Sequence, residues 1–489
     1  MDRKNLAIHR EQTPMTFRHL PKTSVPAFAA AFLALTSISA IAAPPNLLIL
    51  VTDDQRWDAM GCAGNEIIQT PNMDRLAKGG TRFTNAFATT AICCASRASL
   101  LTGMYASTHG IEDFATVLPG ALFAQSYPAL MREAGYHTGF VGKWGVGNVL
   151  PRDKFDVFKG FGGQGQYFND VEGETVHMTE MIGNNAVDYL RERDADKPFC
   201  LSVSFKAPHV QDNDPRQFLF DPVYEDLYMN DTMPVAESAT EEFYNQQPDL
   251  LRVSEGRNRW VRRFSNYEHH QTSVKGYYRL ISGIDIVIGR LMKVLEEKNI
   301  ADNTVIIFTS DHGFFLGERG LAGKWTMHEE SIRVPFIVYD PRPGARNRRA
   351  TAEEAVLNID LAPTVLDFAG IDAPDSMQGR SVRPVTSDSS VPWRTSWYYE
   401  HHFARERKDF IPASEGVRTE DWKYIRYVDA EPVFEELYHV GEDPLEMENL
   451  AGDSVYGDWL AGMRESWRTW RGSLKPWDSI EAKRWKEPE

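Results

Sequence analysis

The chain contains little cysteine, with four residues in 489. Two of them, Cys93 and Cys94, are adjacent, and adjacent cysteines form a disulfide with each other only under strain. The other two, Cys62 and Cys200, are too few to build a disulfide framework. The fold must therefore depend on a hydrophobic core, and with 42% hydrophobic residues the chain has the length of two to three domains of roughly 150 residues each.

Basic residues are also too few to balance the acidic ones. The 53 lysines and arginines face 69 aspartates and glutamates, which gives a formal net charge of −16. Nucleic acids and anionic membranes are bound by clustered Lys and Arg. The charge balance therefore argues against nucleic acid as the main partner, while a small anionic substrate stays compatible with a locally basic site.

Long apolar runs are missing after residue 45. The run before it, AFAAAFLALTSISAIAA, follows the basic residues Arg18 and Lys22 and ends in the small residues that signal peptidase requires. We expect residues 1–43 to be a signal peptide and the protein to be exported, either to the periplasm or as a secreted protein. The alternative is a membrane anchor. A run of about 17 residues rich in Ala and Ser is near the lower limit for spanning a bilayer, so we expect no stable membrane insertion.

Three segments share one design, an apolar run that turns polar at its end: NLLILVT before Asp53 and Asp54, HTGFVGKWG, and NTVIIFTSDHG. Such runs are typical of buried parallel strands. Residues 277–295 have apolar side chains at helical spacing, which predicts a helix between strands. We predict an α/β fold, a large, mostly parallel or mixed sheet sandwiched by helices. The polar strand ends should converge on one cleft, where α/β proteins bind ligands.

Two breaks divide the remaining chain. Residues 211–273 are polar, aromatic and proline-containing, and we predict a loop insertion on the substrate side of the cleft. PVTSDSSVPWR has the composition of a linker, and the aromatic and β-branched segments beyond it predict a small C-terminal antiparallel sheet with a closing helix. We therefore predict a catalytic domain at 44–385 and a C-terminal subdomain at 386–489.

The segment CCASRASLLTG carries the main chemical signal. If a helix begins at Cys93, then Arg97 lies one turn later on the same face. The free backbone N–H groups of a first helical turn bind anions, and an arginine fork adds bidentate recognition of a tetrahedral oxyanion. The segment is suited to hold an anionic group against residue 93. From the residues alone, an inert buried cysteine remains the alternative.

CCASRASLLTG resembles the sulfatase signature, Cys-x-Pro/Ala-Ser-Arg followed by Leu-Leu/Met-Thr-Gly. Further segments are similar to family blocks in family order, and the resemblance spans residues 46–450: LVTDDQR, TPNMDRLAKGGTRFTNAF, FVGKWG, KAPH, NTVIIFTSDHG, GKWTMHEESIRVPFIVY, DLAPTVLDFAGI and ELYHVGEDPLEMENL. The resemblance is to formylglycine-dependent sulfatases, in particular bacterial enzymes acting on polysaccharides and aryl sulfates. It implies an alkaline-phosphatase-like fold and hydrolysis of sulfate esters.

The resemblance identifies Cys93 as the residue that is oxidised to formylglycine, and it implies a formylglycine-generating maturation enzyme as a partner. A hydrated aldehyde attacks sulfur with one hydroxyl, expels the alcohol, and collapses back to the aldehyde as sulfate leaves. The carboxylates of Asp53, Asp54 and Asp311, together with His312, resemble the family's metal site. Hard oxygen ligands suit Ca²⁺, with Mg²⁺ as the alternative.

By the same resemblance, Lys143, His209 and Lys324 surround the sulfate beside Arg97. The two lysines and the arginine would neutralise charge that develops in the transition state. Either His209 or Lys324 would protonate the leaving oxygen.

Two positions depart from the family pattern. Ala95 replaces the commoner proline of the signature, which bears on how well a foreign maturation system converts the cysteine. Gly145 stands where many relatives carry a histidine that assists gem-diol breakdown. Another base, such as His109, would then fill that role, or product release would differ.

The predicted substrate is a sulfated carbohydrate. The export signal, the aromatic-rich insertion and the strand that carries His401 and His402 suggest a site for sugar rings, on whose faces aromatic side chains stack. We predict that both histidines contact the substrate, with packing roles as the alternative. Two other functions remain open: a phosphonate or phosphate ester hydrolase of the same superfamily, and a non-catalytic glycan-binding relative.

Overall fold

The computed structural model describes residues 43–345, 348–403 and 410–477. The predicted signal peptide therefore lies outside the described residues, except for Ala43. The remaining chain, Pro44–Glu489, clusters as one compact unit. Within the described ranges, no helix has both the length and the apolar character that a membrane span requires.

An eight-stranded central sheet has the order β13-β2-β12-β9-β1-β8-β4-β5. Its strands are β1 (Asn46–Asp53), β2 (Thr81–Phe83), β4 (His137–Lys143), β5 (Val157–Phe161), β8 (Phe199–Pro208), β9 (Thr304–Ser310), β12 (Phe336–Tyr339) and β13 (Thr351–Ala352). The five strands from β9 to β5 pair in parallel, whereas β12 pairs antiparallel with both β9 and β2. The predicted mixed sheet is confirmed.

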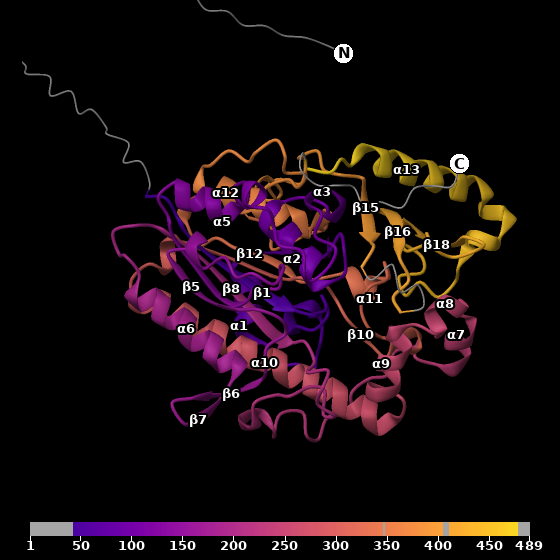
Figure 1. Cartoon of the computed structure of the whole chain (residues 1–489), viewed down its shortest axis with the longest axis horizontal. Coiled ribbons are helices and arrows are strands. Elements are labelled where there is room, and N and C mark those ends of the chain that lie inside the picture. Colours follow the sequence, from indigo (N-terminus) through magenta and orange to yellow (C-terminus); the bar gives the residue numbers. More distant parts are fainter. Residues whose placement is uncertain (1–42, 346–347, 404–409, 478–489) are drawn as a thin grey trace, which may run out of the picture. The chain divides into compact units, whose positions relative to one another are not determined.

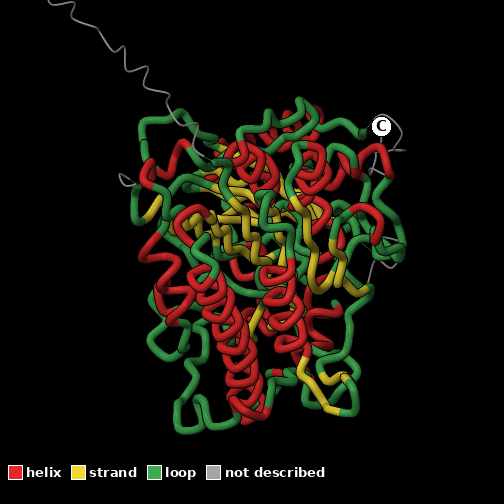
Figure 2. Tube along the Cα trace, turned by 90° about the vertical axis from the view of Figure 1, so that its left-hand side faces the viewer, coloured by secondary structure: helices red, strands yellow, loops and turns green. Residues whose placement is uncertain are grey.

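Helices cover both faces of this sheet (Figures 1 and 2). On one side lie α1 (Pro71–Gly79), α6 (Met178–Glu192) and α10 (Tyr267–Glu297), and on the other α2 (Cys93–Thr102), α5 (Tyr127–Glu133) and α12 (Leu361–Ala369). Strand β1 shows why: Leu48 and Leu50 belong to the first hydrophobic cluster, while Leu47 and Ile49 belong to the second. Alternate side chains of a strand point to opposite faces, so a strand buried on both sides is apolar at every position.

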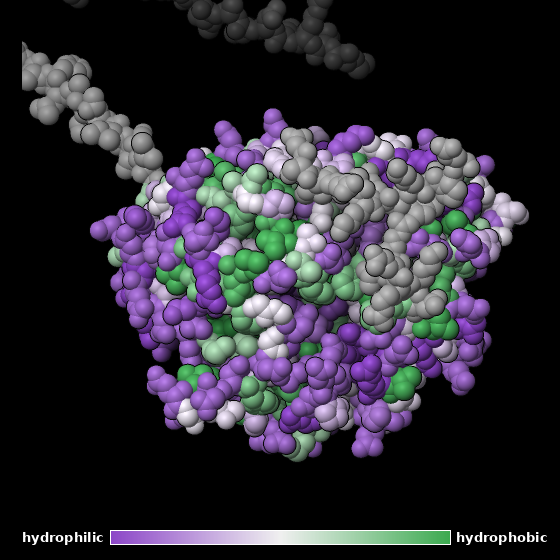
Figure 3. Space-filling view, viewed as in Figure 1, coloured by the Kyte–Doolittle hydropathy of each residue, from purple (hydrophilic) through white to green (hydrophobic). Residues whose placement is uncertain are grey.

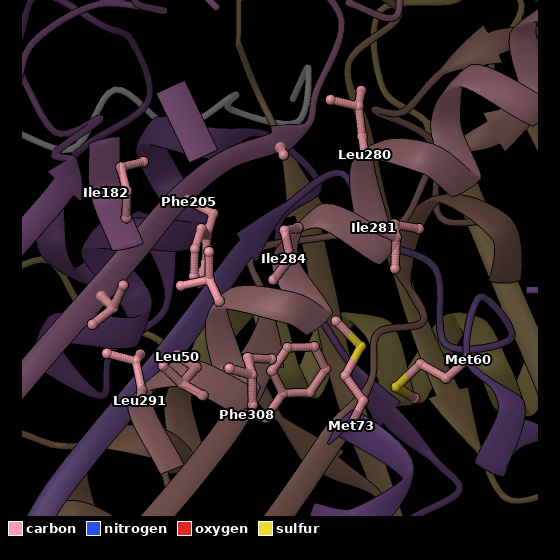
Figure 4. Packing of buried hydrophobic residues seen from close by; sticks show 14 of the residues in the cluster. Leu50, Met60, Met73, Ile182, Phe205, Leu280, Ile281, Ile284, Leu291 and Phe308 are labelled. Atoms are coloured by element: carbon pink, nitrogen blue, oxygen red, sulfur yellow. The ribbon is translucent and has the colours of Figure 1, made fainter. Parts of the chain in front are cut away.

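Helix α10 is the longest element of the described chain, with 31 residues. The side chain of Asn266 accepts a hydrogen bond from the backbone N–H of His269 and caps the helix start. Figure 4 shows Ile284 and Leu291 of α10 near the strand residues Leu50 and Phe308, and Ile281 belongs to the same hydrophobic cluster. The apolar spacing in the sequence therefore marks the core-facing side of α10.

At the surface, Figure 3 shows mostly hydrophilic residues on the face that it draws.

Residues 211–273 contain more regular structure than a loop insertion. They include α7 (Glu241–Gln246), α8 (Asp249–Arg252), α9 (Glu255–Arg263) and the first turns of α10. Helices of four to nine residues expose too few apolar positions to produce a clear periodicity. Apart from 3-10 helices and the C-terminal elements, the remaining strands and α-helices of the described chain are β3 (Ala86–Phe87), β6 (Phe168–Val171), β7 (Glu174–His177), β10 (Phe315–Leu316), β11 (Ala322–Gly323), β14 (Val356–Leu357), α3 (Ala106–His109), α4 (Gly120–Phe123) and α11 (Glu329–Ile332).

The C-terminal part forms a four-stranded antiparallel sheet in the order β15-β16-β17-β18, with α13 (Gly457–Ser473) packed against it. The strands are β15 (Ser396–His401), β16 (Ser414–Thr419), β17 (Trp422–Tyr427) and β18 (Phe434–His439). The predicted sheet and closing helix are confirmed. Their core includes Trp397 and Trp467, and it also takes in Phe87 and Tyr105 from the N-terminal half. The domain boundary at residue 385 stays a prediction.

Candidate active site

The carboxyl ends of neighbouring parallel strands meet at one edge of the central sheet. Asp53 ends β1, Lys143 ends β4, and Asp311 directly follows β9. Because β1 pairs with β8 and β9, and β8 pairs with β4, these ends are adjacent. Asp54 follows Asp53 with a positive φ of 70°, a conformation unusual for a non-glycine residue.

Cys93 lies in the middle of this edge. It is the first residue of α2, a helix without a side-chain cap, and it is 1% exposed. Its Sγ lies 3.4 Å from Asp53 Oδ1, 3.4 Å from His312 Nε2 and 3.8 Å from Lys324 Nζ. All four cysteines are unpaired. The thiol is therefore surrounded by charged groups, an environment unlike that of an inert core cysteine.

Arg97 connects the strand ends through one guanidinium group. Its Nε donates to Asp311 Oδ2 at 2.9 Å and Nη2 donates to Asp53 Oδ2 at 3.0 Å. Its Nη1 donates to the backbone carbonyl of Lys143 at 3.1 Å and to Ser204 Oγ. Burial lowers the pKa of Arg97, but the two carboxylates together raise it above its ordinary value. The helical spacing of Cys93 and Arg97 thus places both side chains at the strand ends.

Two lysines pair with the remaining carboxylate oxygens. Lys143 Nζ contacts Asp53 Oδ2 and donates to Gln164 Oε1 at 2.6 Å, while Lys324 Nζ donates to Asp54 Oδ1 at 2.7 Å. Although burial opposes it, the nearby carboxylates raise the pKa of both lysines. The three aspartates of the site are therefore matched by three permanent cations, Arg97 and the two lysines.

The aspartates differ in their protonation energetics. Burial would raise the pKa of Asp53, but Lys143 and Arg97 hold it well below its ordinary value. At Asp54 burial is the largest effect, and its pKa is raised. Asp54 Oδ2 is buried without a hydrogen-bond partner within the described ranges, and His209 Nε2 lies 3.7 Å away from it.

These residues fit a hard divalent cation. One group of ligand atoms within 4.8 Å of one another comes from Asp53, Cys93, Asp311 and His312, and a second comes from Asp53, Asp54 and His209. The partnerless Oδ2 of Asp54 is an oxygen that such an ion would satisfy. Burial lowers the pKa of His312, but Asp311 raises it to about 9, so ligation by this ring requires loss of its proton.

His209 follows β8 and is 3% exposed. Burial and the charge of Lys324 hold the pKa of His209 well below its ordinary value. Its position is maintained by Tyr167, whose hydroxyl donates to the His209 carbonyl at 2.6 Å. The structure therefore brings together all nine residues that the sequence placed at the site: Asp53, Asp54, Cys93, Arg97, Lys143, His209, Asp311, His312 and Lys324.

The two histidines at the end of β15 differ from each other. His402 Nε2 lies 3.0 Å from Glu415 Oε1, and its Nδ1 lies 3.5 Å from Glu112 Oε1. Each ring nitrogen therefore faces a carboxylate, and among the described residues only the contact of Nε2 is a hydrogen bond. His401 is fully buried, and neither ring nitrogen has a hydrogen-bond partner in the described part of the chain. Their predicted contact with substrate stays a prediction.

Gly145 cannot be replaced by the family histidine without rearrangement. Its φ is +73°, and a Cβ at this position would lie 2.5 Å from Arg97 Cδ. His109 does not substitute for it, because its Nε2 lies 3.1 Å from Ser99 Oγ and its Nδ1 accepts from the Ile111 backbone at 3.0 Å. Burial lowers the pKa of His109 to about 3. The ring therefore stabilises the α2–α3 region.

Sequence reasoning missed several partners of the site. Gln164 and Ser204, the partners of Lys143 and Arg97, lie in no recognisable motif. Lys206, inside the KAPH segment, is 1% exposed and lies over the ring of Tyr167 at 4.7 Å. Burial and the charge of Lys143 lower the pKa of Lys206 to about 8. The only sequence signal that could have placed Lys206 near the site is its position two residues before the end of β8.

A cysteine at a helix start, set among carboxylates and cations at the carboxyl ends of a mixed sheet, is an arrangement that fits a hydrolase site of the alkaline-phosphatase-like class. The chain belongs to the sulfatase family, whose model matches residues 45–371. A second model, N-sulphoglucosamine sulphohydrolase, C-terminal, matches residues 317–471. The protein is therefore an enzyme that hydrolyses sulfate esters.

Named relatives support this assignment. The chain is 30% identical to an N-acetylglucosamine-6-O-sulfatase of Bacteroides thetaiotaomicron, with 84% of this chain and 83% of the relative covered. It is 29% identical to an arylsulfatase of Clostridium perfringens, covering 86% and 93%. The solved structure of BT4656 in complex with its substrate D-glucosamine-2-N,6-O-disulfate matches with a TM-score of 0.74 and 28% identity, covering 88% and 99%.

The same fold occurs in a phosphonate monoester hydrolase of Agrobacterium radiobacter, with a TM-score of 0.74 at 22% identity and coverage of 88% and 95%. At this identity the likeness concerns the fold alone. The choice between sulfate and phosphonate esters therefore depends on the family match and on the site.

Proposed function

We propose that this enzyme removes sulfate from a sulfated carbohydrate, with a formylglycine made from Cys93 as the nucleophile. The observation that carries the proposal is the position of Cys93 Sγ, in contact with Asp53, His312 and Lys324 at the sheet edge. The carbohydrate class is supported by the name of one relative, N-acetylglucosamine-6-O-sulfatase, and by a solved structure that contains D-glucosamine-2-N,6-O-disulfate as substrate.

In this proposal Asp53, Asp54, Asp311 and His312 hold Ca²⁺, with Mg²⁺ as the alternative. When bound, the cation polarises a sulfate oxygen and the hydroxyl of the nucleophile. The carboxylate donors and the partnerless Asp54 Oδ2 support this assignment. Three aspartates face three cations in the protein, so with a divalent ion bound the site would carry a net positive charge that favours an anionic sulfate group.

The cationic side chains bind the sulfate group of the substrate. Arg97 and Lys143 orient the carboxylates and stabilise the charge that accumulates on the sulfate oxygens. Lys324 and His209 both adjoin Asp54, and one of them protonates the alcohol as it leaves. One hydroxyl of the hydrated aldehyde at position 93 attacks sulfur, and the S–O bond to the alcohol breaks. The second hydroxyl of the resulting sulfate ester then loses its proton, and the bond between the carbon of residue 93 and the sulfate-bound oxygen breaks as the aldehyde re-forms and sulfate departs.

Two substrates with different leaving groups test which residue donates the proton. A nitrophenol leaves without protonation, whereas a sugar alcohol does not. A His209→Ala or Lys324→Ala variant that lacks the acid should lose far more kcat on a sugar sulfate than on nitrophenyl sulfate. Equal losses on both substrates would show that the residue binds sulfate and donates no proton.

Mass spectrometry of the peptide that contains Cys93 tests the nucleophile. The protein is produced with a formylglycine-generating maturation enzyme, and Cys93→Ser serves as the matched control. We expect the mass of an aldehyde in place of the thiol, together with hydrolysis of sulfate esters that the control lacks. An unmodified thiol in an active enzyme, or a phosphonate monoester hydrolysed faster than any sulfate ester, contradicts the proposal.

We also propose that residues 1–43 direct export. The basic and apolar order of this segment supports a signal peptide. N-terminal sequencing of the protein recovered from the periplasm or medium of a bacterial host should begin close to Pro44. Recovery of the full-length chain in the membrane fraction would instead indicate an anchor.

A further inference from the structure

Alternate side chains of strand β15 pack against segments that lie near the catalytic residues in the chain. Trp397 stacks on Phe87 with ring centroids 4.9 Å apart, and the hydroxyl of Tyr399 donates to the Trp325 carbonyl at 2.7 Å. Residues i, i+2 and i+4 of a strand share one face, so His401 continues this row. Trp325 directly follows the lysine that contacts the nucleophile. His401 therefore lies on the face of β15 that borders the reaction centre.

The ring of His401 lacks the partners that a buried histidine ordinarily has. Both Nδ1 and Nε2 are buried with no hydrogen-bond partner among the described residues, and the side chain is 0% exposed. Most buried side-chain polar atoms in proteins are paired, and each exception requires an explanation. The adjacent His402 differs, because its Nε2 is hydrogen-bonded to Glu415 Oε1 at 3.0 Å and its Nδ1 lies 3.5 Å from Glu112 Oε1.

The position of His401 is compatible with a ligand-lining role. Burial lowers the pKa of His401 to about 3, and the charge of the adjacent His402 lowers it further. The ring of His401 is therefore neutral near pH 7. Its burial matches that of the reacting groups themselves, since Cys93 is 1% and Lys324 is 5% exposed.

We propose that His401 recognises a free hydroxyl group of the sugar that carries the scissile sulfate. A neutral imidazole has one N–H donor and one nitrogen acceptor, and a hydroxyl can serve either. The ring supplies no charge to compensate a second sulfate or a carboxylate at this position, and burying an uncompensated charge is strongly unfavourable. The preferred substrate is therefore a sugar sulfate whose neighbouring hydroxyl is unsulfated. This inference rests on the proposed sulfatase activity toward carbohydrates.

The test compares sugar sulfates with matched analogues in which one ring hydroxyl at a time is replaced by hydrogen. With the matured wild-type enzyme, removal of the recognised hydroxyl should lower kcat/KM roughly tenfold to a hundredfold. His401→Phe should hydrolyse the sugar and that analogue with equal kcat/KM. His401→Asn keeps a donor and an acceptor and should recover part of the discrimination. His137→Phe, altered at a partly exposed histidine of β4, is the matched control and should discriminate as wild type.

The melting temperature distinguishes ligand recognition from a structural role for His401. If His401 serves the ligand, phenylalanine only removes two unpaired nitrogens, and the Tm of His401→Phe should equal or exceed that of wild type. A lower Tm with discrimination intact in both His401 variants overturns the inference, as does a wild-type enzyme that tolerates the loss of every hydroxyl. Failure of the underlying function is recognised separately, because the wild-type enzyme would then hydrolyse neither sugar sulfates nor nitrophenyl sulfate.

Discussion

The substitution His402→Gln should destabilise the protein in a pH-dependent way. His402 is 7% exposed, with Nε2 3.0 Å from Glu415 Oε1 and Nδ1 3.5 Å from Glu112 Oε1. Glu415 Oε2 also accepts from Trp467 Nε1 at 2.9 Å and pairs with Arg471 Nε at 3.1 Å. The histidine thus links β15 to β16 and, through Glu415, to α13. Glutamine keeps a polar side chain of similar length and removes the charge.

The magnitude follows from the shift in the pKa of His402. Burial would lower this pKa, but Glu112 and Glu415 raise it from 6.5 to about 10. At 1.36 kcal/mol per pH unit this corresponds to roughly 5 kcal/mol, in line with about 3–5 kcal/mol for breaking one side of a buried ion pair. Because the pKa is raised on folding, the contribution is complete below pH 6.5 and is lost as pH rises toward 10.

Urea unfolding of wild type and His402→Gln, followed by tryptophan fluorescence, measures the difference. We expect the variant to lose about 3–5 kcal/mol of unfolding free energy at pH 6 and about 1 kcal/mol at pH 9.5. The control is His137→Gln, because burial lowers the pKa of His137 and its effect changes with pH in the opposite direction. A loss that is the same at both pH values, or below about 1 kcal/mol at pH 6, would refute the reasoning.

Three further predictions concern the site and its scaffold. Gly145→His restores the residue common in relatives, yet at φ +73° its Cβ would lie 2.5 Å from Arg97 Cδ, so we expect kcat on nitrophenyl sulfate to fall at least about tenfold together with Tm. An unchanged kcat would show that the backbone relaxes at little cost. Treatment with a chelator should abolish hydrolysis and lower Tm, and added Ca²⁺ should restore both; a rate and Tm unaffected by the chelator contradict the metal assignment. Arg394→Met breaks a buried bidentate pair with Asp360, at 2.5 and 2.6 Å, and should cost about 3–5 kcal/mol of unfolding free energy while kcat stays near wild type. A loss of kcat in the folded variant would reveal a coupling to the site.

The main strands were predictable because each is a local pattern. β1, β4 and β9 are apolar runs that become polar at their ends, and their side chains are buried almost throughout. The short antiparallel strands β2 and β12, of three and four residues, were not predictable. Segments of this length have no measurable periodicity, and only their pairing with β9 and with each other makes them strands.

The candidate site residues also differ in how far the sequence predicts their positions. The spacing of Cys93 and Arg97 on one helix face is a property of the sequence, since residues one turn apart are neighbours in any α-helix. The partners of Arg97 are a property of the tertiary structure. Ser204 and Asp311, 107 and 214 residues away along the chain, contact its guanidinium only because β8 and β9 both pair with β1.

Two pairs of adjacent residues show what only the tertiary structure decided. Asp53 has a lowered pKa and Asp54 a raised one, although the sequence presents them as equivalent carboxylates. His402 is ion-paired, whereas His401 has neither ring nitrogen bonded within the described ranges. The sequence by itself determined which chemical groups arrive at the strand ends. Which charges those groups meet was decided by tertiary packing, because electrostatic and hydrogen-bond energies depend on distances of a few ångströms between residues remote in the chain.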